Sequence, residues 1–202
     1  MRMRKKKSRG RSRAMIAAIL AALIAGGAFG LYHIVLRTPE GADGGTSVPE
    51  NAEVGTDLGQ KTPDFTLTSL EGEKVSLSDL RGKVVVLDFM ATWCPTCRES
   101  AEKLGPFYEA HRDNDLVIIS VDVTPGETES QLREFKEETD AGWTFALDEG
   151  GSREEEELGE VARKYKVRFI PTYYLVGREG IIKGKWEGEK TSQIEEKVEE
   201  LL

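Results

Sequence analysis

The chain has 202 residues, a net charge of −8 and only two cysteines. The charge is unevenly distributed, because residues 1–13 carry eight basic residues and no acidic ones, which leaves a net charge of −16 on the other 189 residues. A basic tail often suggests nucleic acid, but the segment after it favours a membrane-topology signal. The acidic remainder is typical of a solvated surface, so we expect no nucleic-acid partner.

Residues 14–36 form an apolar segment of 23 residues without Asp, Glu, Lys or Arg. At about 1.5 Å per residue, a helix of this length spans a hydrocarbon core of roughly 30 Å. The favoured interpretation is an uncleaved single-pass anchor, since the apolar stretch continues to Leu36; the alternative is a signal peptide cleaved near residues 25–28, which would release a secreted protein. No nearby cysteine could carry a lipid. Under both interpretations the N-terminus stays cytoplasmic and the rest crosses the membrane.

Residues 37–61 are rich in glycine and acidic residues and are expected to be a flexible linker. Residues 62–202 have the size of one domain. Their hydrophobic patterns predict a β-hairpin, three further strands that alternate with helices, a second hairpin and a final helix. The expected strands are 65–68, 74–77, 84–90, 116–123, 143–147, 172–176 and 181–186, and the expected helices are 95–112, 128–139, 159–165 and 192–202. This order predicts an α/β domain whose mixed sheet is covered by helices.

The two cysteines, Cys94 and Cys97, stand in a C-x-x-C motif between an apolar strand and a helix. A structural zinc site needs four protein ligands, and the chain offers only His33 and His111 besides these cysteines. A structural disulfide across two residues would close too short a loop to constrain the unfolded chain much. The motif therefore predicts a redox-active dithiol.

Each residue of this motif has an expected role. Cys94 is the predicted nucleophile, because it is nearest the helix N-terminus, where the dipole and unpaired N–H groups favour a thiolate. Pro95 suits the first helical turn, Thr96 is the other intervening residue, and Cys97 is the predicted resolving thiol. Trp93 is expected to shield the sulfur and contact substrate, or alternatively to be an aromatic residue at the rim of the core.

Asp88 lies in the middle of the apolar strand predicted over 84–90. A carboxylate in such a place is costly, so its pKa should rise. Two interpretations remain open from the sequence: a proton-handling group, or a structural aspartate held by a buried backbone or Lys partner.

These motifs together resemble the thioredoxin fold. The residues that carry the resemblance are 86–97, 165–172 and Gly188, while 63–67 and the added segment 125–160 resemble the membrane-anchored TlpA/ResA-like branch. The resemblance implies a thioredoxin-like mixed sheet with an N-terminal hairpin. It also implies a thiol:disulfide oxidoreductase, here a membrane-anchored one with its catalytic domain outside the cytoplasm.

The resemblance also implies roles for particular residues. Asp88 would accept a proton from Cys97, and the bond between Ile170 and Pro171 would be cis and face the disulfide, so that the preceding backbone can pair with an extended substrate. The alternative for Pro171 is an ordinary proline at a strand start. The redox-active disulfide would be the only reactive group, without a metal or other cofactor. The implied partners are client protein disulfides or thiols and a membrane electron donor of the thioredoxin-reducing type.

Three residues depart from that branch. Asp88 stands where many members have Asn, Ser100 stands where a Glu often follows the second cysteine, and Glu102 replaces the usual proline of the active-site helix. These departures concern proton handling and helix shape and leave the dithiol itself intact.

Two other functions are open to a protein of this fold. A peroxiredoxin-like thiol peroxidase, with antioxidant activity, needs Thr or Ser three residues before the reactive cysteine, where this chain has Ala91. A copper-delivery module uses a wider cysteine spacing and a distal histidine, whereas His111 is close to Cys97 in sequence. Among oxidoreductase clients, the branch suggests apocytochrome c thiols or copper-site cysteines.

Overall fold

The structure is a computed structural model that describes residues 52–152, 154, 155 and 157–202. The predicted basic tail, the predicted membrane anchor and most of the predicted linker lie outside the described residues. Within the described part of the chain, no helix is both long and apolar enough to cross a membrane.

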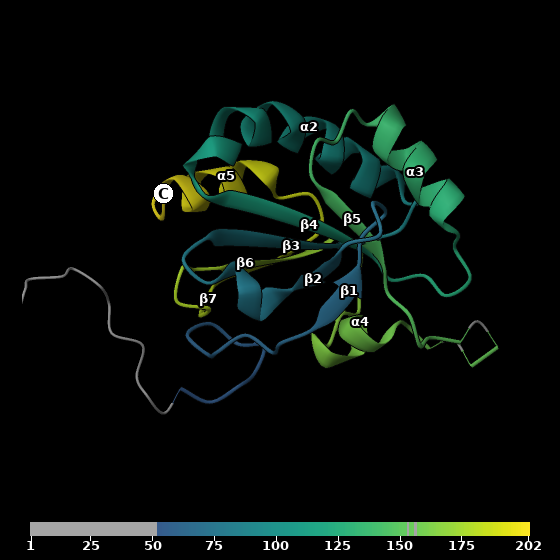
Figure 1. The fold of residues 1–202 in the computed structure, drawn as a ribbon, viewed down its shortest axis with the longest axis horizontal. Coiled ribbons are helices and arrows are strands. Elements are labelled where there is room, and N and C mark those ends of the chain that lie inside the picture. Colours follow the sequence, from purple (N-terminus) through teal and green to yellow (C-terminus); the bar gives the residue numbers. More distant parts are fainter. Residues whose placement is uncertain (1–51, 153, 156) are drawn as a thin grey trace, which may run out of the picture. The chain divides into compact units, whose positions relative to one another are not determined.

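A five-stranded mixed sheet forms the centre of the domain, with the strand order β5-β4-β3-β6-β7 (Figure 1). Strands β3, β4 and β5 are parallel, whereas β6 is antiparallel to β3 and β7 is antiparallel to β6. The strands are β3 (Val84–Met90), β4 (Leu116–Asp122), β5 (Thr144–Leu147), β6 (Thr172–Val176) and β7 (Ile182–Glu187). The predicted mixed sheet is therefore confirmed.

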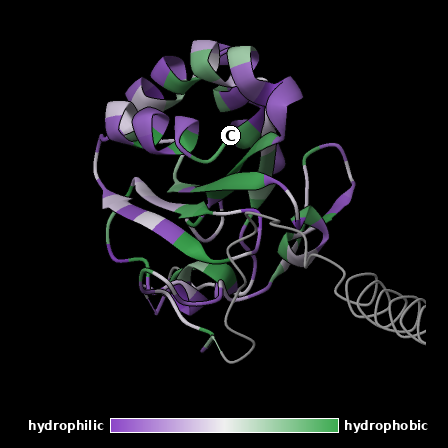
Figure 2. Cartoon of the chain, turned by 90° about the vertical axis from the view of Figure 1, so that its left-hand side faces the viewer, coloured by the Kyte–Doolittle hydropathy of each residue, from purple (hydrophilic) through white to green (hydrophobic). Residues whose placement is uncertain are grey.

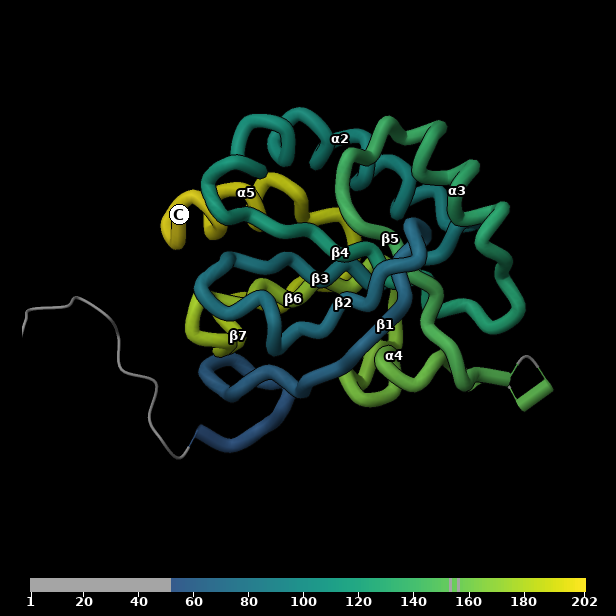
Figure 3. Tube along the Cα trace, viewed as in Figure 1, coloured from purple at the N-terminus to yellow at the C-terminus, as the bar shows by residue number. Residues whose placement is uncertain are grey.

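Helices cover both faces of this sheet (Figures 1 and 3). One face carries the long helix α2 together with α3 and α5, and the other carries the short helix α4, the β1–β2 hairpin and a 3₁₀ helix, η1. The bounds are α2 (Pro95–His111), η2 (Arg112–Asn114), α3 (Glu129–Glu138), α4 (Glu160–Lys164), α5 (Thr191–Glu199), β1 (Thr66–Thr68), β2 (Lys74–Ser76) and η1 (Leu77–Leu80). Apolar residues concentrate in the strands and polar residues on the outer sides of the helices (Figure 2).

Strand β3 positions the candidate site, because all seven of its residues are buried. Side chains alternate between the two faces of a strand. Val86 and Met90 accordingly pack in the cluster with α2, and Leu87 and Phe89 pack in the cluster with α4. By the same alternation, Asp88 points to the α2 side, under the helix that carries the cysteines.

A local signal accounts for the start of helix α3. Helix α3 starts after Thr128, whose hydroxyl accepts a hydrogen bond from the Gln131 amide while the Gln131 side chain accepts one from the Thr128 amide, a capping box. The last helix ends at Glu199, short of the predicted Leu202. Helix α2 contains Pro106. This proline lies four residues beyond Glu102, and it is Glu102 that occupies the position of the branch's usual proline.

Residues 59–61, at the end of the predicted linker, pair with the domain. The Gln60 carbonyl accepts a hydrogen bond from the Ile182 amide at 3.0 Å, and the Gly59 amide donates to the Ile182 carbonyl at 2.9 Å. Strand β7 is the edge of the sheet, and unpaired edge groups gain from a covering segment. A polar sequence can supply this backbone pairing without any apolar pattern.

Candidate active site

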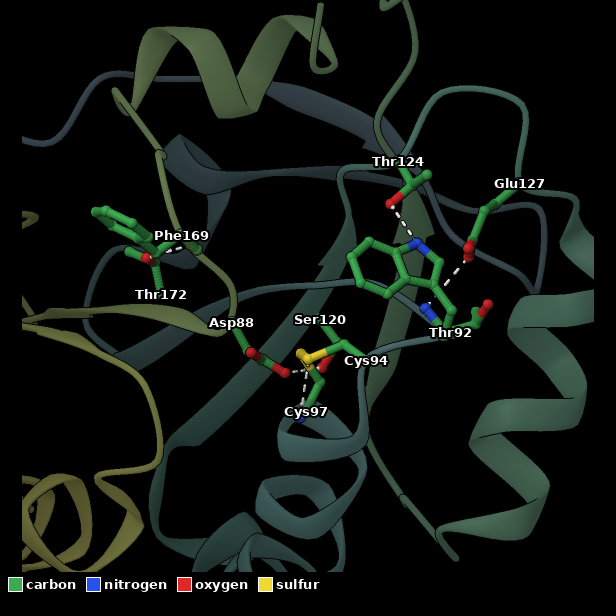
Figure 4. Close-up of a disulfide and its surroundings, with 10 residues drawn as sticks. Asp88, Thr92, Cys94, Cys97, Ser120, Thr124, Glu127, Phe169 and Thr172 are labelled. Carbon is green, nitrogen blue, oxygen red and sulfur yellow. Dashed lines mark hydrogen bonds between the residues drawn. A yellow bond between two sulfur atoms is a disulfide. The ribbon is translucent and has the colours of Figure 1, made fainter. Parts of the chain in front are cut away.

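The two cysteines form a disulfide at the N-terminus of α2 (Figure 4). Cys94 is the N-cap residue, Pro95 is the first residue of the helix, and the Cys94–Cys97 Cα atoms are 5.3 Å apart. The Cys97 amide donates a hydrogen bond to Cys94 Sγ at 3.1 Å. After reduction, this donor and the helix dipole are placed to stabilise a thiolate on Cys94.

Both cysteines are nearly buried, with Cys94 5% and Cys97 2% exposed, but only Cys94 borders the surface. A surface hollow beside the disulfide includes Cys94 but not Cys97 in its lining, which is made of Thr92, Trp93, Cys94, Pro95, Arg98, Glu99 and Glu102. Thr96 is exposed on the first turn of α2. A thiolate on Cys94 could therefore attack an incoming disulfide, while Cys97 could attack from within the protein.

Trp93 is 64% exposed, although its indole N–H donates a hydrogen bond to the Thr124 hydroxyl at 3.2 Å. The side chain forms part of the hollow that Cys94 lines. It is thus placed to contact whatever approaches Cys94.

The peptide bond between Ile170 and Pro171 is cis. Thr172 pairs with Phe89 in the β3–β6 register, so this bond lies beside the end of β3 that leads into the cysteine motif. Phe169 is 63% exposed. Among the described residues, the Pro171 carbonyl accepts a hydrogen bond from Gly188, while no backbone partner is present for Ile170. The Ile170 backbone is therefore available for strand-like pairing with a substrate.

Asp88 is buried and shares a hydrogen bond with a serine of the neighbouring strand. The Ser120 hydroxyl donates to Asp88 Oδ2 at 2.8 Å, and the Trp143 indole N–H donates to Ser120 Oγ at 2.9 Å. Burial raises the pKa of the Asp88 carboxyl from its ordinary value of 3.8 to about 7, and the hydrogen bond from Ser120 opposes the rise. The Asp88 carboxyl thus bonds a neutral hydroxyl, with no Lys partner among the described residues, and Figure 4 shows it close to the cysteine pair.

Three polar residues lie around Asp88, of which Ser120 and Tyr173 were not identified from the sequence and Ser100 was noted only as a departure from the branch. In the sheet register, Asp88 pairs with Ser120 on one side and Tyr173 on the other, so all three side chains share the α2 face. Ser100 of α2 is buried over the same face. Within the described chain, Asp88 Oδ1, Ser100 Oγ and the Tyr173 hydroxyl have no hydrogen-bond partner. Burial, and then the charge on Asp88, raise the pKa of Tyr173.

One of these residues had a usable signal in the sequence. Ser120 interrupts an apolar run as Asp88 does, so pairing the two predicted strands would have placed them together. Tyr173 and Ser100 look like ordinary strand and helix residues, and only the three-dimensional packing brings them under the disulfide.

The residues relevant to the alternative functions lie as follows. Ala91 is buried and offers no hydroxyl to a peroxide. His111 ends α2, the opposite end from Cys94, and its Nδ1 lies 2.9 Å from the Phe107 carbonyl. Among the described residues, no cluster of three or more His, Cys, Asp or Glu side chains could hold a metal ion.

Comparison with known proteins identifies the relatives of this chain. The AhpC/TSA family profile matches residues 58–185. The thiol-disulfide oxidoreductase ResA of Bacillus thuringiensis subsp. konkukian is 31% identical over 141 residues, which cover 69% of this chain and 76% of that protein. The thioredoxin-like protein YneN of Bacillus subtilis is 34% identical over 149 residues, covering 73% and 82% respectively.

A solved structure supports the same relationship. The crystal structure of a protein assigned as the thiol:disulfide interchange protein DsbE from Chlorobium tepidum has a TM-score of 0.61 and 27% identity, and the match covers 72% of this chain and 97% of that one. The predicted thioredoxin-like fold is therefore confirmed. Thiol-disulfide oxidoreductases of this family react through a cysteine pair and need no other cofactor. With a disulfide between Cys94 and Cys97 at the N-terminus of α2, the chain belongs to the AhpC/TSA family and, within it, to the ResA-like thiol-disulfide oxidoreductases.

Proposed function

We propose that this chain is a membrane-tethered, extracytoplasmic oxidoreductase that exchanges disulfides with client proteins through Cys94 and Cys97. The observation that carries the proposal is the placement of Cys94 in a surface hollow with Cys97 behind it. A Cys94 thiolate attacks a client disulfide and forms a mixed disulfide, and one client cysteine leaves as a thiolate. Cys97 then attacks Cys94, which releases the second client cysteine and regenerates the Cys94–Cys97 disulfide.

Asp88 supports the second of these steps. With a pKa of about 7, its carboxyl group can accept the Cys97 proton in the same pH range in which the exchange runs. The buried position of both groups on the α2 side of the sheet keeps that proton away from bulk water. We assign Asp88 the role of general base for Cys97.

The client is proposed to bind in an extended conformation between Trp93 and the Ile170–Pro171 bond. Trp93 and Phe169 are exposed apolar side chains, which suit apolar residues that flank a client cysteine. The available Ile170 backbone would pair with the client strand. The proposed clients are proteins whose cysteines must be kept reduced outside the cytoplasm, such as apocytochrome c or the cysteines of copper sites, and a membrane thiol donor would reduce the enzyme again.

A pair of peptides tests the client class. One carries the C-x-x-C-H sequence of a haem-attachment site as an intramolecular disulfide, and the other is identical except that a glycine replaces the histidine. The reduced full chain is mixed with each peptide in a single turnover, and the released peptide thiols are measured. Faster reduction of the first peptide supports the apocytochrome client; equal rates for both favour a different client.

The proposed tether predicts an N-in, C-out topology. The basic residues 1–13 and the uncharged segment 14–36 support it. Protease added to spheroplasts should digest the domain or cut it from the membrane, while an N-terminal tag stays protected. Full protection of the domain in spheroplasts, with digestion only after lysis, would contradict this topology.

A further inference from the structure

The loop after β4 holds the two residues that precede Cys94. The Thr92 amide donates a hydrogen bond to Glu127 Oε2 at 3.2 Å, and the Trp93 indole N–H donates to the Thr124 hydroxyl at the same distance (Figure 4). Thr124 lies 31 residues from Trp93 in sequence, and Glu127 lies 35 residues from Thr92. Neither the redox chemistry nor the client contacts proposed above involve Thr124 or Glu127.

The buried carboxyl group of Asp122 forms a hydrogen bond with this loop. Asp122, at the end of β4, is 1% exposed, and its Oδ1 accepts a hydrogen bond from the Thr124 amide at 2.9 Å. The Glu127 carboxyl and the Thr92 amide both lie close to the Asp122 carboxyl, although Asp122 Oδ2 forms no hydrogen bond among the described residues. Burial first, and then Glu127, raise the pKa of Asp122. Two adjacent carboxyl groups in such a place do not both ionise readily.

These contacts fit one arrangement of protons. Asp122 keeps its proton and shares it with the Glu127 carboxyl, whose Oε2 accepts the Thr92 amide hydrogen bond. The Thr124 amide and hydroxyl then link Asp122 to Trp93.

We propose that Asp122 and Glu127 are positioning residues for Cys94, acting as a carboxyl pair that shares one proton and fastens the Thr92–Trp93 segment beside the disulfide. When the pair loses this proton at higher pH, two negative charges face each other. Asp122 is fixed by its strand and by the Thr124 amide. Glu127 is half-buried and lies on the loop after β4, so it is the group that moves, and the Thr92 amide loses its hydrogen bond to Glu127.

The other charged groups around the pair are already engaged. Arg98 and Glu138 line the hollow beside Thr92 together with Glu134, and Arg98 pairs with Glu138 at 2.7 Å. Asp148 contacts the Asp122 carbonyl through its backbone amide, while its carboxylate accepts hydrogen bonds from the amides of Val161 and Ala162. Among the described residues, no ion pair is formed by Asp122 or Glu127, so the shared proton is what balances their charges.

Loss of the shared proton is expected to change the reactivity of Cys94. This inference rests on the proposed disulfide exchange and does not depend on the client or on membrane attachment. Thr92 and Trp93 lead directly into the N-cap of α2. A loosened segment would place Cys94 Sγ less accurately against the Cys97 amide and would uncover the hollow that Trp93 borders. The exchange rate should therefore fall as the pair loses its proton.

Two substitutions of Glu127 separate the parts of this proposal. In Glu127→Gln, the amide oxygen can still accept from Thr92 and the amide N–H can donate to Asp122, so the bonds remain but the shared proton is gone. In Glu127→Ala, the bonds are lost. Glu129→Gln is the control, because Glu129 is exposed and faces Arg133 at 3.5 Å.

The readout is the NMR signal of the Thr92 amide and the Trp93 indole N–H in the oxidised full chain, followed from pH 6 to pH 10. In the wild type and in Glu129→Gln, both signals should shift in one common step above neutral pH. In Glu127→Gln this step should be absent. In Glu127→Ala, the Trp93 signal should lie at the high-pH wild-type position throughout. In a separate measurement, the reduced variant should exchange with a peptide disulfide about tenfold more slowly than the reduced wild type, the factor that a lost hydrogen bond of about 1.4 kcal/mol makes.

Two results would overturn the proposal. One is a pH step in Glu127→Gln equal to that of the wild type, because the titrating group would then lie elsewhere. The other is a Glu127→Ala protein with wild-type Thr92 and Trp93 signals. Neither result touches the proposed client or direction of exchange, since the oxidised protein is observed without a client.

Discussion

Replacing Cys97 with serine is expected to trap mixed disulfides between Cys94 and client proteins, the largest change that any single substitution should produce. Cys94 lines the surface hollow and remains able to attack. Without Cys97, the second attack that releases the client cannot occur. The trapped species should appear as additional bands on a non-reducing gel of membranes from cells that express Cys97→Ser, and they should vanish on reduction.

Cys94→Ser is the matched control. It leaves one free thiol in the protein, as Cys97→Ser does, but Cys97 is not part of the surface hollow that Cys94 lines. We expect few trapped species with this variant, and alkylation of the reduced wild type at mildly acidic pH should modify Cys94 first. Equal trapping by both variants would show that the assignment of the two thiols is wrong.

Asp88→Asn is expected to slow disulfide exchange without affecting the first attack. An asparagine cannot take the proton of Cys97, so the release of the mixed disulfide should slow by about a hundredfold, the lower end of what general acid–base catalysis contributes. Alkylation of Cys94 should be nearly unchanged. Single-turnover reduction of insulin separates the two steps, because formation and decay of the mixed disulfide are observed in sequence.

The same substitution should stabilise the protein above neutral pH. The pKa of Asp88 is raised to about 7 in the folded state, so the unfolded chain releases this proton at lower pH than the folded one. Stability therefore falls between roughly pH 4 and pH 7, and the cost above pH 7 amounts to about 4 kcal/mol. Asparagine removes this cost but weakens the bond from Ser120. We expect a gain of about 2–4 kcal/mol at pH 8 and almost none at pH 4.

Denaturant titrations of wild type and Asp88→Asn at pH 4 and pH 8 check this sign. Ser120→Ala is a useful companion, because it removes the hydrogen bond to the carboxyl and keeps the carboxyl itself. A loss of stability in Asp88→Asn at pH 8, together with exchange at the wild-type rate, would mean that Asp88 is a structural residue.

The sequence predicted the fold well because local patterns determine most of it. The uniformly apolar run over β3 indicates a strand covered on both faces, and the structure buries all its residues. The Thr128 cap marks the start of α3 in the sequence itself. The C-x-x-C motif likewise predicted the disulfide at the helix start, since residues of one turn are neighbours whatever surrounds them.

What the sequence did not reveal depends on pairing between distant strands. Ser120 and Tyr173 become neighbours of Asp88 only through the registers of β3 with β4 and β6. Glu127 reaches Thr92 only because the loop after β4 folds over the active-site segment. Gly59 and Gln60 pair with the edge strand β7 through backbone groups, and a side-chain pattern does not predict such pairing.

The reduction potential of the Cys94–Cys97 pair tests the central claim most directly. The full chain is equilibrated in a series of glutathione and dithiothreitol buffers, and the fraction of free thiol is measured by alkylation. A redox-active pair should titrate reversibly as a two-electron couple with a midpoint between about −120 and −270 mV, the range of thioredoxin-like oxidoreductases. A midpoint below about −300 mV, typical of structural disulfides, would contradict the claim that this disulfide reacts with clients.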